Sequence, residues 1–164
     1  MEGFTKKEIA LFKKLDTPAK VQSFLNGLKF NFETQKGLKR ETLKSPLFTM
    51  RVKEAHCMEG ALLGAHILSR HGFKPYIIHL KATKHDYDHV VAPFKIGGLW
   101  GALSKTNHAV LRYREPVYKS IRELAMSYFH EYFLDDGLPA QAGSKTLRQY
   151  SELLNLNDFE KGWE

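Results

Sequence analysis

The sequence has a single cysteine, Cys57, among 164 residues, so the chain cannot form an internal disulfide. A lone cysteine is typical of proteins in a reducing compartment. No uncharged stretch approaches the roughly 20 apolar residues that cross a bilayer, and residues 1–7 lack the apolar core of a signal peptide. We therefore expect a cytoplasmic protein that does not associate with membranes.

The sequence also lacks internal repeats, low-complexity tracts and linker-like segments, which predicts one domain over residues 1–164. This length is sufficient to bury a core without disulfides or metal ions. The net charge is +7, from 25 Lys and Arg against 18 Asp and Glu, and acids interrupt the basic residues throughout. This scatter favours a solvated basic surface, so we expect no nucleic-acid partner, while an acidic substrate or partner stays open.

Hydrophobic periodicity predicts an α+β fold, with N-terminal helices, a central cysteine-bearing helix on a small antiparallel sheet, and C-terminal helices. The hydrophobic residues of 29–50 show no clear periodicity, which predicts a long loop containing at most a short helix or strand. The predicted helices cover 4–16, 18–28, 57–71, 117–133 and 145–154, and the predicted strands 75–80, 89–95, 99–105 and 109–114.

Cys57 begins a run of small residues, in which Ala61, Gly64 and Ala65 share its helical face. Each glycine within a helix costs about 1 kcal/mol relative to alanine, so Gly60 and Gly64 indicate close packing against a neighbouring element. A thiol in the first helical turn feels the positive end of the helix dipole, which lowers its pKa. Cys57 is thus a candidate nucleophile, and the alternative is a small buried hydrophobic residue.

A nucleophilic thiol needs a base and a group that orients this base. Among eight histidines we favour His89, because it begins a strand after a polar loop and can face the start of a helix. A hairpin turn over 96–98 places Ser104 or Lys105 opposite His89. Ser104 or Asn107 is therefore the candidate orienting residue.

Other polar and aromatic residues are candidates for the substrate side of such a site. One candidate donor to an oxyanion is the backbone N–H of Cys57. Two others are the side chains of Gln22 and Asn26, which share one helical face. Trp100 is a candidate substrate contact, and a core role is the alternative.

Two histidines four residues apart, His85 and His89, lie among carboxylates and would suit a metal ion if they were on a helix. We interpret this segment as a loop entering a strand, where that spacing has no such meaning. We therefore predict neither a metal nor another cofactor.

Two parts of the chain carry a family resemblance. The segment AHCMEGALL at 55–63, followed by ILSRHGFKP at 67–75, resembles the cysteine helix of the transglutaminase-like branch of papain-fold proteins. The segment HVVAPF at 89–94, with GLW at 98–100, resembles the histidine strand of that family and its return. Residues 104–114 and 127–133 resemble a group of small bacterial members.

The resemblance implies a papain-like fold in which Cys57 attacks an amide, His89 acts as base, and a thioester forms. The implied activities are those of proteases, amidases and amide transferases, with a peptide or protein amide as substrate. Where this family usually has Asp, the present sequence has Ser104. Two hypotheses follow: a cysteine-dependent amide hydrolase or acyl transferase, or an inactive domain of this fold that binds a peptide or protein beside Cys57.

Overall fold

The computed structural model describes residues 3–33, 42–134 and 144–159. Its α-helices are α1 (Lys6–Lys14), α2 (Pro18–Gly27), α3 (Pro46–Val52), α4 (Cys57–Ser69) and α5 (Ile121–Met126). Its strands are β1 (Lys29–Phe30), β2 (Glu54–Ala55), β3 (Tyr76–Ala82), β4 (His89–Ile96), β5 (Leu99–Ser104), β6 (Arg114–Tyr118), β7 (Leu147–Tyr150) and β8 (Leu154–Asn155). Short 3-10 turns follow at η2 (Phe129–Glu131) and η3 (Leu156–Asp158).

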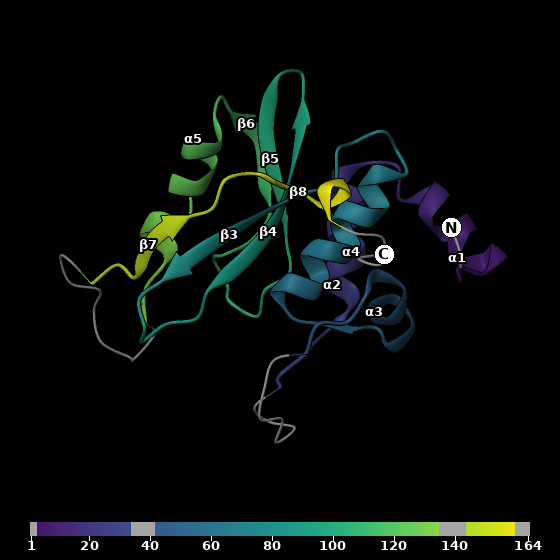
Figure 1. Ribbon diagram of the computed structural model, residues 1–164, viewed down its shortest axis with the longest axis horizontal. Helices are drawn as coiled ribbons and strands as arrows, with labels where there is room; N and C mark the ends of the chain where they lie inside the picture. Colours follow the sequence, from purple (N-terminus) through teal and green to yellow (C-terminus); the bar gives the residue numbers. More distant parts are fainter. Residues whose placement is uncertain (1–2, 34–41, 135–143, 160–164) are drawn as a thin grey trace.

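The helices and the sheet occupy two sides of the molecule, which confirms the α+β class. Figure 1 shows α1 to α4 on one side, and the twisted sheet with α5 on the other. The main sheet has the order β6-β5-β4-β3-β7, all pairs are antiparallel, and β8 also pairs with β3. One apolar cluster joins the N-terminal helices and α4 to the sheet, and a second lies under α5. No helix in the described part of the chain is both long and apolar enough to span a bilayer.

Helix α2 begins as the sequence indicates. The Thr17 hydroxyl accepts a hydrogen bond from the Lys20 N–H at 3.3 Å, and Pro18 occupies the first helical position. Buried residues such as Val21 and Leu25 then direct one face of α2 toward α4. This packing brings the side chain of Gln22 to the end of β5.

Helix α4 is the centre of the fold, because every residue from Glu59 to Leu68 is buried. Its two glycines allow the close contacts that the sequence indicated. A Cβ at Gly64 would lie 2.8 Å from Leu103 Cδ1, and one at Gly60 would overlap the Cβ of Lys105. The Lys105 side chain crosses this glycine to donate hydrogen bonds to carbonyl oxygens at the end of α2. Gly60 therefore makes room for a link between β5, α4 and α2.

Replacing Gly60 with alanine is expected to lower the free energy of unfolding by about 1–2 kcal/mol, since overlap with Lys105 outweighs the gain in helix propensity. Thermal and urea unfolding measure the change. Gly27→Ala is the matched control, because nothing lies within 4 Å of a Cβ at that helical position. Equal stabilisation by both substitutions would contradict this packing.

The β4–β5 hairpin sets the register at the candidate site. Gly97 and Gly98 form a two-residue turn with φ of 57° and 84°, values that favour glycine. The turn pairs Ile96 with Leu99 and Val91 with Ser104. The expected pairing of His89 with Ser104 or Lys105 is therefore wrong, because the turn lies one residue nearer β5. Ser104 is instead the diagonal neighbour of His89 on the same face.

The region after β5 differs from prediction. The expected strand at 109–114 is wrong, and the strand β6 begins where that range ends. The expected helix at 117–133 is also wrong over its first turn, because β6 pairs with β5 as an edge strand and tolerates Pro116, which has no N–H. Val117 is consequently 61% exposed. The helical parts of this range are α5, which Ser120 caps, and the short 3-10 turn η2.

The expected C-terminal helix at 145–154 is wrong. The Thr146 carbonyl accepts a hydrogen bond from the Thr83 N–H, and the Thr146 N–H donates one to the Tyr132 carbonyl. Strand β7 then pairs with β3. Residues Leu154 and Asn155 return to the same strand as β8. This segment covers an edge of β3 that would otherwise leave backbone groups unpaired, so pairing outweighs its helical propensity.

Candidate active site

Cys57 lies where the start of α4 meets the start of β4. It is the first residue of α4, with His56 as N-cap, and it is half-buried. Its Sγ lies 4.0 Å from the carbonyl oxygen of Asp88, and the backbone N–H of Val90 donates to it. The thiol is therefore placed at the edge of the sheet, at the positive end of the helix dipole.

Two histidine side chains lie against the thiol. Burial alone would raise the pKa of Cys57, but hydrogen bonds with His56 and His89, the charge of His89 and the Val90 N–H lower this pKa to about 6. At pH 7 about nine tenths of such a thiol is thiolate, compared with a few per cent of an ordinary cysteine. Cys57 is thus chemically suited to act as a nucleophile.

The hydrogen bonds of Ser104 define the tautomer of His89. Nε2 of His89 lies 2.8 Å from the Ser104 Oγ, and that hydroxyl donates its one hydrogen to the carbonyl oxygen of Leu111 at 2.5 Å. Ser104 can then only accept, so Nε2 of the neutral imidazole carries the hydrogen. Nδ1 keeps its lone pair and is left to hydrogen-bond with Cys57. This is the protonation state of a general base.

Gln22 holds the backbone of Ser104 in place. Its Oε1 accepts from the Ser104 N–H at 2.9 Å, and its Nε2 donates to the Ser104 carbonyl at 2.8 Å. The remaining Nε2 hydrogen goes to Asn26 Oδ1 at 2.8 Å. Both amide hydrogens of Gln22 are therefore used within the protein, so Gln22 is not free to act as the expected oxyanion donor. Asn26 accepts from Gln22 through its Oδ1 and is exposed, and its role as an oxyanion donor stays a prediction.

The other two sequence-predicted residues lie outside this cluster. Asn107 is exposed in the loop after β5, while the ring nitrogen of His89 that it was expected to orient bonds Ser104. Trp100 is at the other end of β5, where it pairs with Lys95, about 13 Å along the strand from Ser104. The Lys95 ammonium lies 5.1 Å from the centre of its ring. Trp100 therefore belongs to the hairpin rather than to the Cys57 site.

The loop that leads into His89 is fixed on both sides. The Tyr132 hydroxyl donates to the Tyr87 carbonyl at 2.9 Å. The carboxylate of Asp88 accepts from the Ala82 N–H at 2.8 Å and lies 2.7 Å from His79 Nε2. These contacts hold the chain at the point where β4 begins, which limits how far the imidazole of His89 can move.

Sequence reasoning missed His56 and Glu59. His56 Nε2 hydrogen-bonds with the Thr42 carbonyl at 2.7 Å, and the Glu59 side chain, fully buried, accepts from the His56 N–H at 3.1 Å. Together they form a capping box in which histidine replaces the usual serine or threonine. The available signal was a glutamate three residues after the N-cap position.

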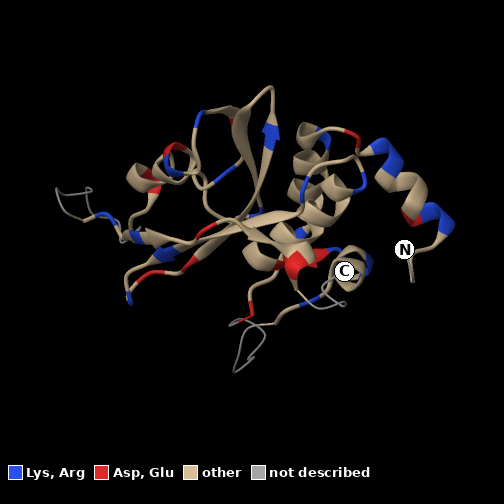
Figure 2. Ribbon diagram, turned by 45° about the horizontal axis from the view of Figure 1, so that its top comes forward, with Lys and Arg blue, Asp and Glu red and all other residues tan. Residues whose placement is uncertain are grey.

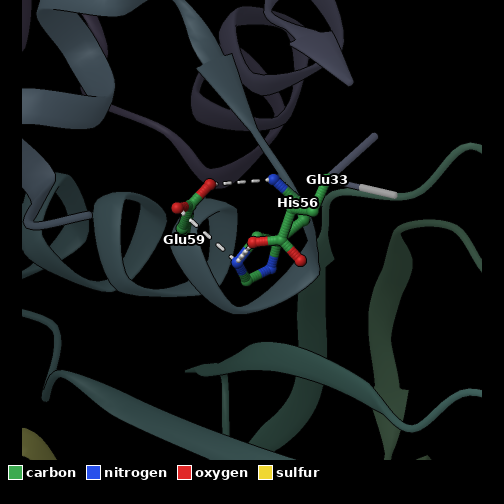
Figure 3. A group of neighbouring side chains, drawn as sticks. All are labelled: Glu33, His56 and Glu59. Atoms are coloured by element: carbon green, nitrogen blue, oxygen red, sulfur yellow. Dashed lines mark hydrogen bonds and ion pairs between the residues drawn. The ribbon is translucent and has the colours of Figure 1, made fainter. Parts of the chain in front are cut away.

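Figure 3 shows Glu33 and Glu59 approaching the same His56 ring nitrogen, at 3.6 Å and 3.5 Å. Ligand atoms of these three residues lie within 4.8 Å of one another, the only such group among the described residues. However, the Lys44 ammonium is 2.8 Å from Glu59, and the Nε2 lone pair is absent when that nitrogen donates to Thr42. These donors are already used within the protein, so we assign no metal here.

The alternative metal pair is not formed. His85 is exposed in the loop before β4, and Nε2 of His89 bonds Ser104. The segment is a loop entering a strand, as interpreted from the sequence.

The charged residues are scattered over the molecule. Figure 2 shows lysines and arginines on both sides of it, with acidic residues between them.

No protein-family model and no curated protein matches this sequence. Solved structures do match in fold. One is described as the crystal structure of a TGase, with 12% identity, a TM-score of 0.45, and an alignment over 85% of this chain and 44% of that chain. Another, from Cytophaga hutchinsonii, is described as a candidate cysteine protease, with 13% identity, a TM-score of 0.45, and coverage of 94% and 57%.

This chain spans about half the length of those two proteins. A similarity at this level does not carry a function from one protein to another. The chemistry of the site therefore rests on its own contacts.

Proposed function

We propose that this protein is a cysteine-dependent acyl-transfer enzyme, which hydrolyses an amide or passes its acyl group to an amine. The observation that carries this proposal is the line of hydrogen bonds from His89 through Ser104 to the Leu111 carbonyl, beside a thiol whose pKa His89 lowers. It joins an acidic thiol to an imidazole whose free lone pair faces that thiol. The resemblance to transglutaminase-like proteins in the sequence around Cys57 and His89 supports the same chemistry.

The reaction begins when Cys57 Sγ attacks the carbonyl carbon of the substrate, and Nδ1 of His89 holds the proton that left the thiol. The C–N bond then breaks, the amine leaves with this proton, and a thioester to Cys57 remains. Water or a second amine attacks the thioester and gives its proton to Nδ1. The C–S bond breaks, the product acid or amide leaves, and the proton returns to the Cys57–His89 pair.

The oxyanion of each tetrahedral intermediate forms beside the start of α4. The backbone N–H of Cys57, at the first helical position, is the donor we assign to it. We also propose a peptide or protein amide as substrate, and a reducing, cytoplasmic setting, because a thiolate of this acidity is readily oxidised.

The experiment uses p-nitrophenyl acetate with the full-length protein. We expect release of one equivalent of p-nitrophenol before steady turnover, and a mass increase of one acetyl group on the peptide that contains Cys57. Cys57→Ala should show neither, while His85→Ala, which changes an exposed histidine of the nearby loop, should match the wild type. Absence of the acetylated peptide from the folded protein would favour the inactive binding domain instead.

A further inference from the structure

Strand β4 has an open edge near its C-terminal end. Strand β3 pairs with the first part of β4, as far as the pair of Ile78 with Val91. Among the described strands, none pairs with that side of β4 beyond Val91, and the rest of β4 pairs with β5 alone. Figure 1 shows the β4–β5 hairpin extending past the start of β3.

Two local features end the pairing of β3 with β4. If the register continued, Tyr76 would lie opposite Pro93. Pro93 has no N–H to donate. The Tyr76 N–H donates to the Lys74 carbonyl at 3.0 Å, within its own segment. The chain before β3 therefore turns away from β4 and leaves the edge of β4 uncovered.

The hairpin turn decides which backbone groups point out of this edge. The two residues that flank a two-residue turn bond to each other, and the direction of the backbone groups then alternates along the strand. Ile96 pairs with Leu99 across the turn, so the backbone groups of Phe94 also point to β5. Those of Pro93 and Lys95 point the other way. One N–H and two carbonyls are therefore directed away from β5, in the arrangement that an extended peptide can bond.

Side chains beside this edge form a pocket of about 370 Å³ with two different walls. Phe73 packs against the apolar cluster on the α4 side of the sheet, whereas Trp100 belongs to the cluster on the α5 side. The rings of Tyr76 and Trp100 lie 6.1 Å apart. Successive side chains of a strand point to opposite faces, so a strand laid along the edge would meet these two walls in turn.

The charged side chains of the pocket are both positive. Lys74 and Lys95 line it, and no carboxylate of the described residues lies within 4.0 Å of either ammonium. The Lys95 ammonium lies 5.1 Å from the centre of the Trp100 ring. An acidic side chain on the Trp100 wall would therefore meet a cation that has no ion-pair partner there. The same edge of a second copy would bring two Lys95 side chains together, which like-charge repulsion opposes.

From these observations we infer that the edge of β4 at Pro93 to Lys95 binds an extended acidic peptide, which adds to the sheet as a strand. The backbone of the peptide bonds the edge, its acidic side chains face Lys95 and Trp100, and the apolar side chains between them face Phe73. The edge lies at the far end of the hairpin from Ser104, since Trp100 is about 13 Å along β5 from that residue. The inference thus goes beyond the proposed function and does not depend on it.

The test measures binding of the peptide acetyl-Glu-Val-Glu-Phe-Glu-Val-amide, in which acidic and apolar residues alternate, to the full chain. The sequence has two tryptophans, so Trp163→Phe leaves Trp100 as the only one and makes its emission a report on the pocket. We expect a saturable change in this emission. The affinity should be at least tenfold higher than for acetyl-Lys-Val-Lys-Phe-Lys-Val-amide, and it should fall as salt is raised.

Charge reversal at the edge is the matched comparison. Lys95→Glu should weaken binding of the acidic peptide at least tenfold, because attraction is replaced by repulsion. Lys13→Glu makes the same change in net charge on the exposed face of α1 and should change the affinity less than twofold. Cys57→Ala should bind as the wild type does, so a failure of the proposed function would leave this result unaffected. Circular dichroism checks that each variant is folded.

Methylation of the peptide nitrogens separates strand addition from simple charge attraction. Only every second N–H of an added strand points toward β4. Methyl groups on one set of alternate nitrogens should therefore abolish binding, while methyl groups on the other set should weaken it less than threefold.

Equal binding of the acidic and basic peptides, or equal effects of Lys95→Glu and Lys13→Glu, would overturn the inference. So would acidic-peptide binding that responds alike to both sets of methyl groups. A dimer that the peptide dissociates in light scattering would assign the edge to a second copy. Tighter binding after removal of residues 160–164 would assign it to that segment of the chain. Either of these results would also overturn the inference.

Discussion

Replacing His89 with alanine is expected to slow both formation and hydrolysis of the acetyl-enzyme by about 100- to 10,000-fold. The hydrogen bonds of Ser104 leave the lone pair of His89 Nδ1 free to take the proton. Without it, water must take the proton in each step. Stopped-flow measurement of p-nitrophenol release gives the two rates separately.

Ser104→Ala provides the graded comparison for this prediction. It removes the acceptor of His89 Nε2 and the donor to the Leu111 carbonyl, but it leaves the imidazole. A loss of about tenfold is expected, because a hydrogen bond of about 1–1.5 kcal/mol no longer holds the ring and its tautomer. A loss as large as that of His89→Ala would mean that Ser104 has a direct role in the chemistry, and no loss in His89→Ala would contradict the assigned base.

Replacing Gln22 with leucine is expected to lower the free energy of unfolding by about 3 kcal/mol, and the melting temperature by about 10 °C. The substitution removes both hydrogen bonds to the Ser104 backbone, at 2.9 Å and 2.8 Å, and leaves a buried N–H and carbonyl without their partner. Differential scanning calorimetry measures this loss.

Asn26→Ala is the matched control, because this exposed residue accepts a hydrogen bond from Gln22 but does not reach Ser104. It should cost less than about 1 kcal/mol. Gln22→Leu should also slow the acetyl-enzyme reaction, since Ser104 is no longer fixed under His89. Equal stability of the two variants would show that the Ser104 backbone finds other partners.

The helix that carries Cys57 could be read from the sequence, because its pattern is local. Small residues at helical spacing and two glycines indicated a closely packed element, and the structure places Gly60 against Lys105 and Gly64 against Leu103. The β4–β5 hairpin was equally local, since Gly97 and Gly98 mark the turn. The predicted register of this hairpin was wrong by one residue, because a two-residue turn and a three-residue turn differ little in sequence.

The segments after β5 could not be predicted in the same way. Residues 117–133 and 145–154 contain apolar residues at helical spacing, but β6 and β7 form because strands β5 and β3 offer open edges. Pairing with a distant strand is not encoded in a local pattern. The same is true of the contact between His56 and Glu33 and of that between Glu59 and Lys44, because each joins different parts of the chain.

By itself, the sequence determined the α+β class, the position of the only thiol at the start of a helix, and the strand that begins with His89. Local periodicity and capping residues suffice for these features, because they depend on neighbours in the chain. Only the tertiary structure decided which side chains meet the sulfur, which nitrogen of His89 is free, and that Gln22 supports Ser104. Those contacts join residues far apart in sequence, and their geometry depends on how the helices pack against the sheet.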